Sequence, residues 1–269
     1  MRLRDIVLAG GLLTAGLFGF APTLVAAAEK PKPAQPVISE EANAALLRMG
    51  HTLGGAEHFS FQARTIRVYS DIGGQPLHIF HALKIVVQRP NRLFAEAGGD
   101  DGTTKLVFDG KTAYIFSAAQ NKYAKIPVPD GTIEGMLKEA VGRLGVDFPL
   151  ADFLTSAPNK AFLTGVTAGR VVNTVTIDGA PYLHLFFGQP PGIELEQWLS
   201  KNDQSQPSRL IVTYRMLPGQ PNFIAEFSDW SFDVHPSDAA FAFQPPAGAV
   251  EVALKPVAPP PAAKRKGSK

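Results

Sequence analysis

Two histidines separated by two residues, His78 and His81, have the spacing most suggestive of chemistry in this sequence. On a helix, an H-x-x-H pair would share one face and could bind a metal ion. Here the surrounding residues, QPLHIFHALKIVVQRP, predict a long β-strand that ends at Pro90. Residues three apart in a strand point to opposite faces. We therefore expect no shared metal site at His78 and His81.

The other candidates for chemistry have structural explanations. His184 lies in the apolar stretch YLHLFF, which favours a buried, hydrogen-bonded histidine. Glu194 and Glu196 share one face of a predicted strand and could act as an acid–base pair, but a solvent-facing charged strand explains them as well. Asp100 and Asp101 in GGDDG supply too few oxygen ligands for calcium, so this stretch predicts a hairpin loop.

The sequence contains no recognisable catalytic motif. It has no G-x-S-x-G, phosphate-binding P-loop, H-E-x-x-H or S-x-x-K. We therefore predict a protein that is not an enzyme, with no catalytic residue, no metal ligand and no cofactor. A secreted hydrolase stays open as an alternative, because catalytic triads converge in space rather than in sequence. Such a site would need a histidine such as His184 close to a serine or a carboxylate.

The first 28 residues predict a secretory signal peptide. A basic start, MRLRD, precedes a long apolar run, and Ala26-Ala27-Ala28 offers small residues for cleavage before Glu29. A retained transmembrane anchor is the alternative, which the glycines and the proline within the run disfavour. The absence of cysteine excludes a lipid anchor at the cleavage site and any disulfide. We therefore expect a bacterial periplasmic or secreted protein.

Composition divides the remaining chain into three parts. Residues 29–38 predict a proline-rich leader, residues 39–254 a single domain, and residues 255–269 a disordered tail rich in proline and lysine. The formal charge of +2 resides in the tail, which ends in KRKGSK, and the domain itself is net negative. A negative domain argues against nucleic-acid binding, which requires a basic face.

The domain reads as mainly β. Ser39 is expected to cap a helix that ends at Gly54-Gly55, and strands follow almost without interruption, with a bulge expected near Thr65. Two helices are predicted in the middle, over residues 132–145 and 149–156. About ten to twelve strands with two or three helices indicate a sandwich or a barrel.

Several of these strands are apolar on both faces. In VFDGKTAYIFSAAQNKYAK, large apolar residues occupy successive positions, so each side of the sheet carries some of them. One face forms the core, and helices, a partner or a ligand must cover the other. If the sheet is strongly curved, helices in its concavity leave an apolar pocket. The alternative is a filled core with no cavity.

Six segments carry a resemblance to a known family: RPNRLFAEAGGD, VFDGKTAYIFSAAQNKYAKIPVP, PLADFL, YLHLFF, RLIVTYRMLPGQP and FAFQPPAGA. In this order they resemble a family of predicted periplasmic proteins classed as a domain of unknown function. The order of elements is also similar to the lipoprotein-carrier (LolA/LolB-like) superfamily. That resemblance implies a curved antiparallel half-barrel of about ten to twelve strands, with two or three helices packed on the concave side.

The superfamily resemblance further implies a cavity that accepts acyl chains and is lined by aromatic strand residues. By that analogy the candidate ligand-binding residues are Phe80, Phe94, Phe108, Tyr114, Phe116, Phe186 and Trp198. The implied function is binding or carrying a lipid-like or amphipathic ligand. The alternative is a non-catalytic structural or interaction protein of the cell envelope, whose basic tail contacts anionic surfaces weakly and in a salt-sensitive way.

Overall fold

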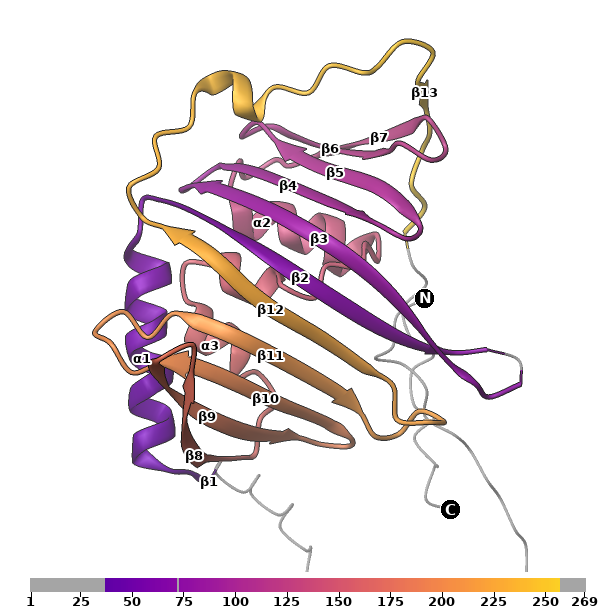
Figure 1. Ribbon diagram of the computed structural model, residues 1–269. Coiled ribbons are helices and arrows are strands. Elements are labelled where there is room, and N and C mark those ends of the chain that lie inside the picture. Colours follow the sequence, from indigo (N-terminus) through magenta and orange to yellow (C-terminus); the bar gives the residue numbers. More distant parts are fainter. Residues whose placement is uncertain (1–36, 72, 257–269) are drawn as a thin grey trace, which may run out of the picture. The chain divides into compact units, whose positions relative to one another are not determined.

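One curved β-sheet organises the part of the chain that the computed structural model describes, residues 37–71 and 73–256 (Figure 1). Within these residues the sheet has thirteen strands, in the order β1-β8-β9-β10-β11-β12-β2-β3-β4-β5-β6-β7-β13. The strands are β1 (Val37–Ile38), β2 (His58–Ser70), β3 (Pro76–Gln88), β4 (Arg92–Gly99), β5 (Gly102–Phe108), β6 (Thr112–Ser117), β7 (Lys122–Pro127), β8 (Ala168–Ile177), β9 (Ala180–Gln189), β10 (Ile193–Ser200), β11 (Pro207–Tyr214), β12 (Asn222–Ser231) and β13 (Val250–Glu251).

The sheet confirms the predicted fold class. Neighbouring strands are antiparallel from β8 through to β7, and only the two-residue strands β1 and β13 pair in parallel, one at each edge. The predicted division into signal peptide, leader, domain and tail stays a prediction, because residues 1–36 and 257–269 lie outside the described part. No helix within that part is long and apolar enough to cross a membrane.

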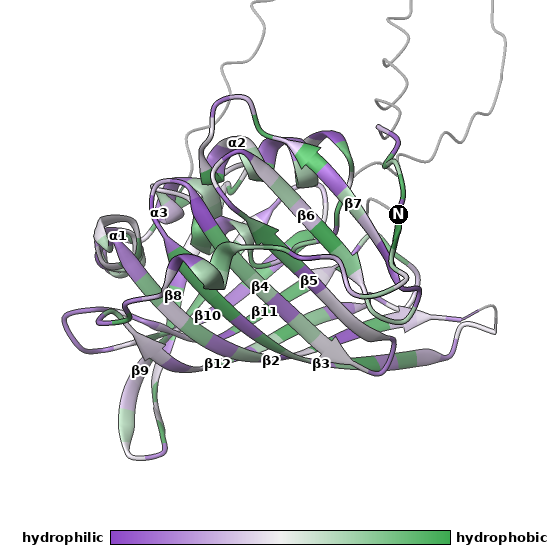
Figure 2. Ribbon diagram, turned by 90° about the horizontal axis from the view of Figure 1, so that it is seen from above, coloured by the Kyte–Doolittle hydropathy of each residue, from purple (hydrophilic) through white to green (hydrophobic). Residues whose placement is uncertain are grey.

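Most of the helices lie on the concave side of the sheet (Figure 2). The helices on this side are α1 (Glu40–Gly55), α2 (Ile133–Leu137), the π-helix η1 (Lys138–Arg143), the 3₁₀-helix η2 (Ala151–Leu154) and α3 (Pro158–Phe162). The 3₁₀-helix η3 (Asp238–Phe241) belongs to the C-terminal segment and contacts Arg92 on the opposite side of the sheet. We call the helix-covered side of the sheet the inner face and the opposite side the outer face.

Helix α1 begins and ends where the sequence predicts. The Ser39 side chain accepts a hydrogen bond from the Ala42 amide, and the helix ends at Gly55. Its apolar stripe is buried against the sheet and α3. Close packing on α3 requires a glycine at position 50, since a Cβ there would lie 2.5 Å from the Asn159 Oδ1 atom.

The middle helical region differs in detail from the prediction. The Gly135 amide donates to the Thr132 hydroxyl, which caps the helix, but the single helix predicted over residues 132–145 changes from α2 into the π-helix η1 at Lys138. The short helix expected over residues 149–156 is η2, and α3 follows it without having been predicted.

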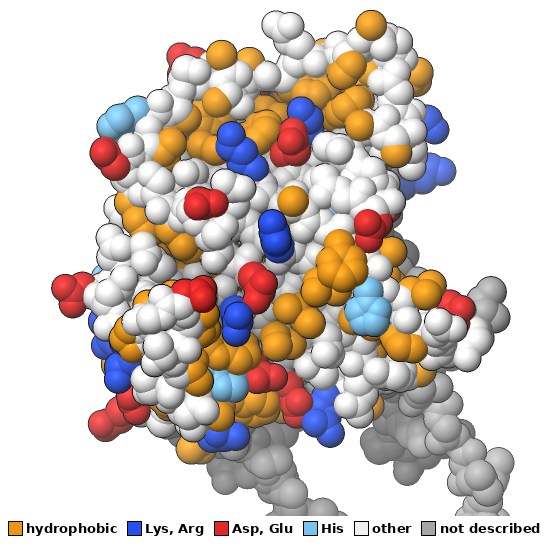
Figure 3. All heavy atoms as spheres, in the orientation of Figure 1, with side chains coloured by type: hydrophobic (Ala, Val, Ile, Leu, Met, Phe, Trp, Pro, Cys, Tyr) orange, Lys and Arg blue, Asp and Glu red, His pale blue; other side chains and the backbone are white. Residues whose placement is uncertain are grey.

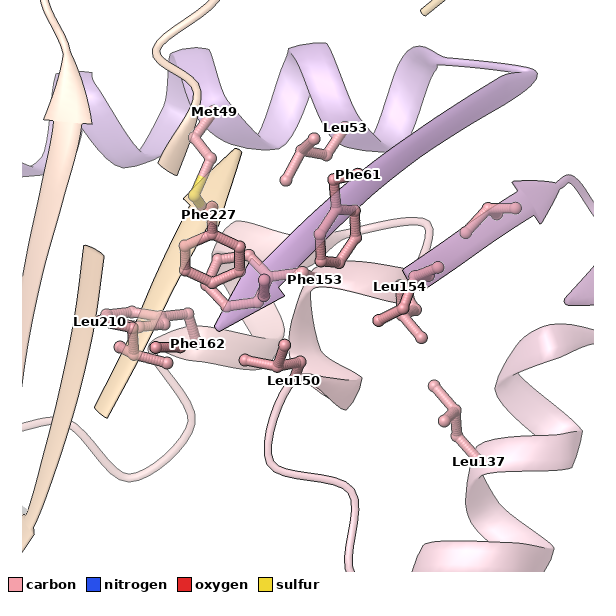
Figure 4. Close-up of a cluster of buried hydrophobic side chains, with 14 of the residues drawn as sticks. Met49, Leu53, Phe61, Leu137, Leu150, Phe153, Leu154, Phe162, Leu210 and Phe227 are labelled. Atoms are coloured by element: carbon pink, nitrogen blue, oxygen red, sulfur yellow. The ribbon is translucent and has the colours of Figure 1, made fainter. Parts of the chain in front are cut away.

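The space between the helices and the inner face is packed with side chains at one end of the sheet (Figure 4). Strands β2 and β12 contribute Phe61 and Phe227, which lie against Phe153 of η2. The buried side chains labelled in Figure 4 are Met49, Leu53, Phe61, Leu137, Leu150, Phe153, Leu154, Phe162, Leu210 and Phe227. This end of the concavity is therefore a filled core.

Arg89 ties the helices to the sheet at this filled end. Directly after β3, its guanidinium donates to the carbonyl oxygens of Leu53, Leu154 and Thr155 at 2.7–3.0 Å and lies over the Phe59 ring. Burial lowers the pKa of Arg89, and the nearby Glu134 carboxylate opposes that effect. One cation therefore joins the C-terminal end of α1 to the η2 segment and to the end of β3.

Replacing Arg89 with methionine should lower the free energy of unfolding by about 2–4 kcal/mol, because three buried carbonyl groups lose charge-assisted hydrogen bonds. Urea unfolding followed by circular dichroism measures the change. Arg64→Met, at an exposed position on β2, is the matched control and should change stability little. Equal effects of the two substitutions would contradict the role of Arg89.

The Glu134 carboxylate accepts a 2.6 Å hydrogen bond from the Ser156 amide. Burial acts to raise the pKa of Glu134, but the hydrogen bonds from Ser156 and the charge of Arg89 lower it below the ordinary 4.5. The ionised Glu134 carboxylate therefore contributes its full stabilisation above pH 4.5. This stabilisation is lost as the pH falls through the lower pKa that Glu134 has in the folded protein. The difference in unfolding free energy between wild type and Glu134→Gln should therefore shrink as the pH falls, as urea unfolding at successive pH values measures; a difference that stays constant would contradict this role of Glu134.

Candidate ligand-binding face

The inner face is mostly apolar, and its burial changes from one end to the other. Thr65, Arg67 and His81 interrupt the apolar residues of β2 and β3 toward the less covered end. On β2 and β3 the residues near the Arg89 end, such as Phe59 and Ile85, are fully buried. Further along, Leu83 is only partly buried, and the last inner-face pair, Tyr69 and Leu77, is exposed. We call this less covered end, where β2 ends and β3 begins, the open end.

Neighbouring strands show the same gradient. On β10, Leu199 and Gln197 are fully buried, whereas Ile193 is partly exposed. Further inner-face residues toward the open end are partly exposed as well, namely Ala95, Ile115, Val212 and Tyr214. The helices therefore bury one half of an apolar face and leave the other half within reach of solvent.

The segment that follows η1 partly covers the open end. It carries Leu144, Val146 and Phe148, which are partly buried against the core. Asp147 in this segment pairs with Arg67 of β2, whose guanidinium lies 5.5 Å from the centroid of the Phe223 ring. One ion pair therefore holds the segment across the inner face.

A buried amide lies deep on the inner face. Gln197 of β10 is fully buried beneath α1, with Leu185 and Leu210 as its cross-strand neighbours. Its Nε2 atom contacts the Met49 sulfur at 3.3 Å, and its Oε1 atom has no hydrogen-bond partner among the described residues. An unsatisfied buried acceptor is unfavourable, so this position is a polar weak point in an apolar core.

The structure divides the seven candidate ligand-binding residues between the two faces. Phe108 is fully buried on the inner face, where it pairs with Leu93 and Ala113. The register of the paired strands places the other six on the outer face: Phe80, Phe94, Tyr114, Phe116, Phe186 and Trp198. These six do not face the helices, and a role for any of the seven in ligand binding stays a prediction.

The C-terminal segment covers part of the outer face. Figure 3 views this face, where hydrophobic side chains gather over β5 to β7 and the C-terminal segment. Phe243 stacks on Tyr114 at a centroid distance of 5.0 Å and also contacts Phe116 and Tyr123. Beside it, Arg92 and Asp238 form an ion pair at a shallow cavity of about 270 Å³. The second apolar face is thus covered in part by the chain itself.

Two histidines lie beside carboxylates, which is the contact that the hydrolase alternative requires of a histidine such as His184. His78 and His81 point to opposite faces, as predicted, and His81 pairs with Asp101 at 2.6 Å. His184 contacts the Glu196 carboxylate at 2.8 Å, and its ring stacks flat on Trp198 at 4.0 Å. No group of three or more potential metal ligands occurs among residues 37–71 and 73–256.

Replacing Gln197 with leucine should raise the free energy of unfolding by about 1–2 kcal/mol, because the unsatisfied amide oxygen is removed from the core. Thermal and urea unfolding of the ligand-free protein measure the change. Gln62→Leu, at an exposed outer-face position, is the control and should have little effect. A destabilised Gln197→Leu variant would mean that the amide oxygen has a partner in solution, such as a buried water.

Several solved structures are similar to this chain at low sequence identity. An uncharacterized conserved protein from Thermus thermophilus is 8% identical with a TM-score of 0.46, and the match covers 78% of this chain and 98% of that one. A LolA superfamily protein from Nitrosomonas europaea is 9% identical with a TM-score of 0.39, and the match covers 75% of this chain and 97% of that one. LprF from Mycobacterium bovis is 14% identical with a TM-score of 0.47, and the match covers 75% of this chain and 99% of that one. Similarity at this level says nothing about ligand or mechanism.

No curated protein sequence matches the chain. A family model described as "Predicted periplasmic protein (DUF2092)" matches residues 42–255, which include every strand of the sheet from β2 to β13. This match confirms the resemblance carried by the six sequence segments. The chain belongs to the DUF2092 family of predicted periplasmic proteins.

Proposed function

We propose that this protein binds a lipid-like or amphipathic ligand on the inner face of its sheet, within the bacterial periplasm. The observation that carries the proposal is the gradient of burial along that face. Apolar inner-face residues such as Ile79 and Leu77 continue past the point where the helices cease to bury it, beside the polar Arg67 and His81. Burial of exposed apolar surface by an apolar ligand is favourable by about 25 cal/mol for each Å².

The filled end limits where such a ligand can lie. Side chains from α1, η2 and α3 already occupy the concavity above Phe61 and Phe227, and Arg89 holds the helices in place. A ligand would therefore enter at the open end, between β2–β5 and the segment that carries Asp147. Deeper entry would require the helices to move away from the sheet.

A structural role in the cell envelope is the competing function, and the filled end is the observation that favours it. In that case the open end binds nothing, and the basic tail, which lies outside the described residues, contacts anionic surfaces. Deletion of residues 255–269 should then abolish association with envelope fractions at low salt. Ligand binding at the inner face predicts instead that the truncated protein still takes up an apolar probe.

Mass spectrometry of organic extracts from the purified protein tests the proposal directly. We expect a co-purifying lipid, or saturable uptake of a fluorescent fatty acid when the protein is purified ligand-free. The absence of both would leave the structural role as the better account.

Leu83→Gln should weaken binding of the fluorescent fatty acid by about tenfold, because it places a polar amide on the inner face near the open end. Ala82→Gln is the matched control, since Ala82 is the preceding residue of β3 and points to the outer face. The control should bind like wild type. If both variants bind equally, the ligand does not lie on the inner face of β3.

A further inference from the structure

Large exposed apolar side chains gather around the open end. Tyr69, Leu77, Phe80 and Met216 are 46%, 45%, 52% and 65% exposed. Tyr69 and Leu77 face each other across β2 and β3, and Phe80 follows on β3. Met216 lies in the turn after β11. We call these four residues the apolar rim.

The rim belongs to one continuous end of the molecule. The Ser70 hydroxyl at the end of β2 donates to the Pro218 carbonyl oxygen, which joins the β2–β3 hairpin to the β11–β12 turn. Met216 lies against Gly192 in the turn before β10. A Cβ atom at position 192 would lie 2.4 Å from the Met216 Cγ atom. The ends of these hairpins lie at the same side of the sheet in Figure 1.

Several charged groups beside the rim have partners within the protein. Arg215 pairs with Glu194, and Arg67 pairs with Asp147. The Asp71 carboxylate accepts from two amides of its own turn, and the Asp100 carboxylate accepts from the Phe80 amide. Satisfied polar groups lower the penalty of moving a surface out of water. The apolar rim is therefore suited to an uncharged, apolar environment.

We propose that the apolar rim docks onto the surface of a phospholipid bilayer, so that the open end faces the membrane. This inference rests on the proposed function, because the rim surrounds the place where a lipid-like ligand would enter. The rim is continuous with the inner face through Tyr69 and Leu77. A ligand could then pass between bilayer and inner face without crossing water. Tyrosine and bulky apolar side chains are the residues that anchor peripheral proteins at such interfaces.

Vesicle flotation tests the docking. Ligand-free full chain is mixed with vesicles of phosphatidylethanolamine and phosphatidylcholine, and the floated fraction gives a partition coefficient. We expect the double variant Phe80→Asp/Met216→Asp, which changes two rim residues that do not lie on the inner face, to lower this coefficient at least tenfold. The matched control Leu47→Asp/Val172→Asp changes two residues that are 42% and 39% exposed elsewhere, on α1 and β8, and should float like wild type.

A second measurement separates this inference from the proposed function. Uptake of a soluble fluorescent fatty acid in the absence of vesicles should be the same for wild type and both double variants. Wild type that takes up the fatty acid but does not float would overturn the docking alone, and wild type that does neither would overturn the proposed function as well. Equal loss of flotation in both double variants would also overturn membrane docking. So would a dimer in solution that only the rim substitutions dissociate, because another copy of the chain would then cover the rim.

Discussion

The constraint on which this structure depends is the incomplete covering of one apolar sheet face. An antiparallel sheet can leave one face to water, but its apolar face must be buried. Here the inner face is mostly apolar, with Arg67 and His81 interrupting it toward the open end, and α1, α2, η2 and α3 bury it only toward the end marked by Phe59 and Ile85. The remaining half, toward Tyr69 and Leu77, is the part of the molecule where a ligand has most to gain.

The buried end acts as the fixed part of the fold. Arg89 satisfies carbonyl groups at the ends of two helical segments, where unpaired carbonyls are otherwise expected. This arrangement makes the helices a stable cover rather than a loose one. The segment that partly covers the open end, in contrast, is held across the inner face by the ion pair between Arg67 and Asp147 and by partly buried side chains. Any movement that admits a ligand should therefore begin there.

Contacts on the outer face explain why several strands carry apolar residues on both faces. The C-terminal segment lays Phe243 over Tyr114, Phe116 and Tyr123, so one apolar patch of the outer face is covered by the chain itself. Elsewhere on this face, aromatic residues pack against their cross-strand neighbours, as Trp198 does against His184. Apolar residues on both faces are therefore explained without a second ligand site.

The sequence by itself determined the elements and the family. Capping by Ser39, the strand through His78 and His81, the start of the middle helical region and the six family segments all follow from local patterns. Tertiary structure decided which face each strand residue occupies, because a shift of one position reverses the faces. The irregular pattern near Thr65 is not a bulge, since β2 pairs with β3 without interruption and the apolar Ile66 and Val68 lie on the outer face. The roles of Arg89, Gln197 and the open end depend on contacts between segments distant in sequence, which no local pattern records.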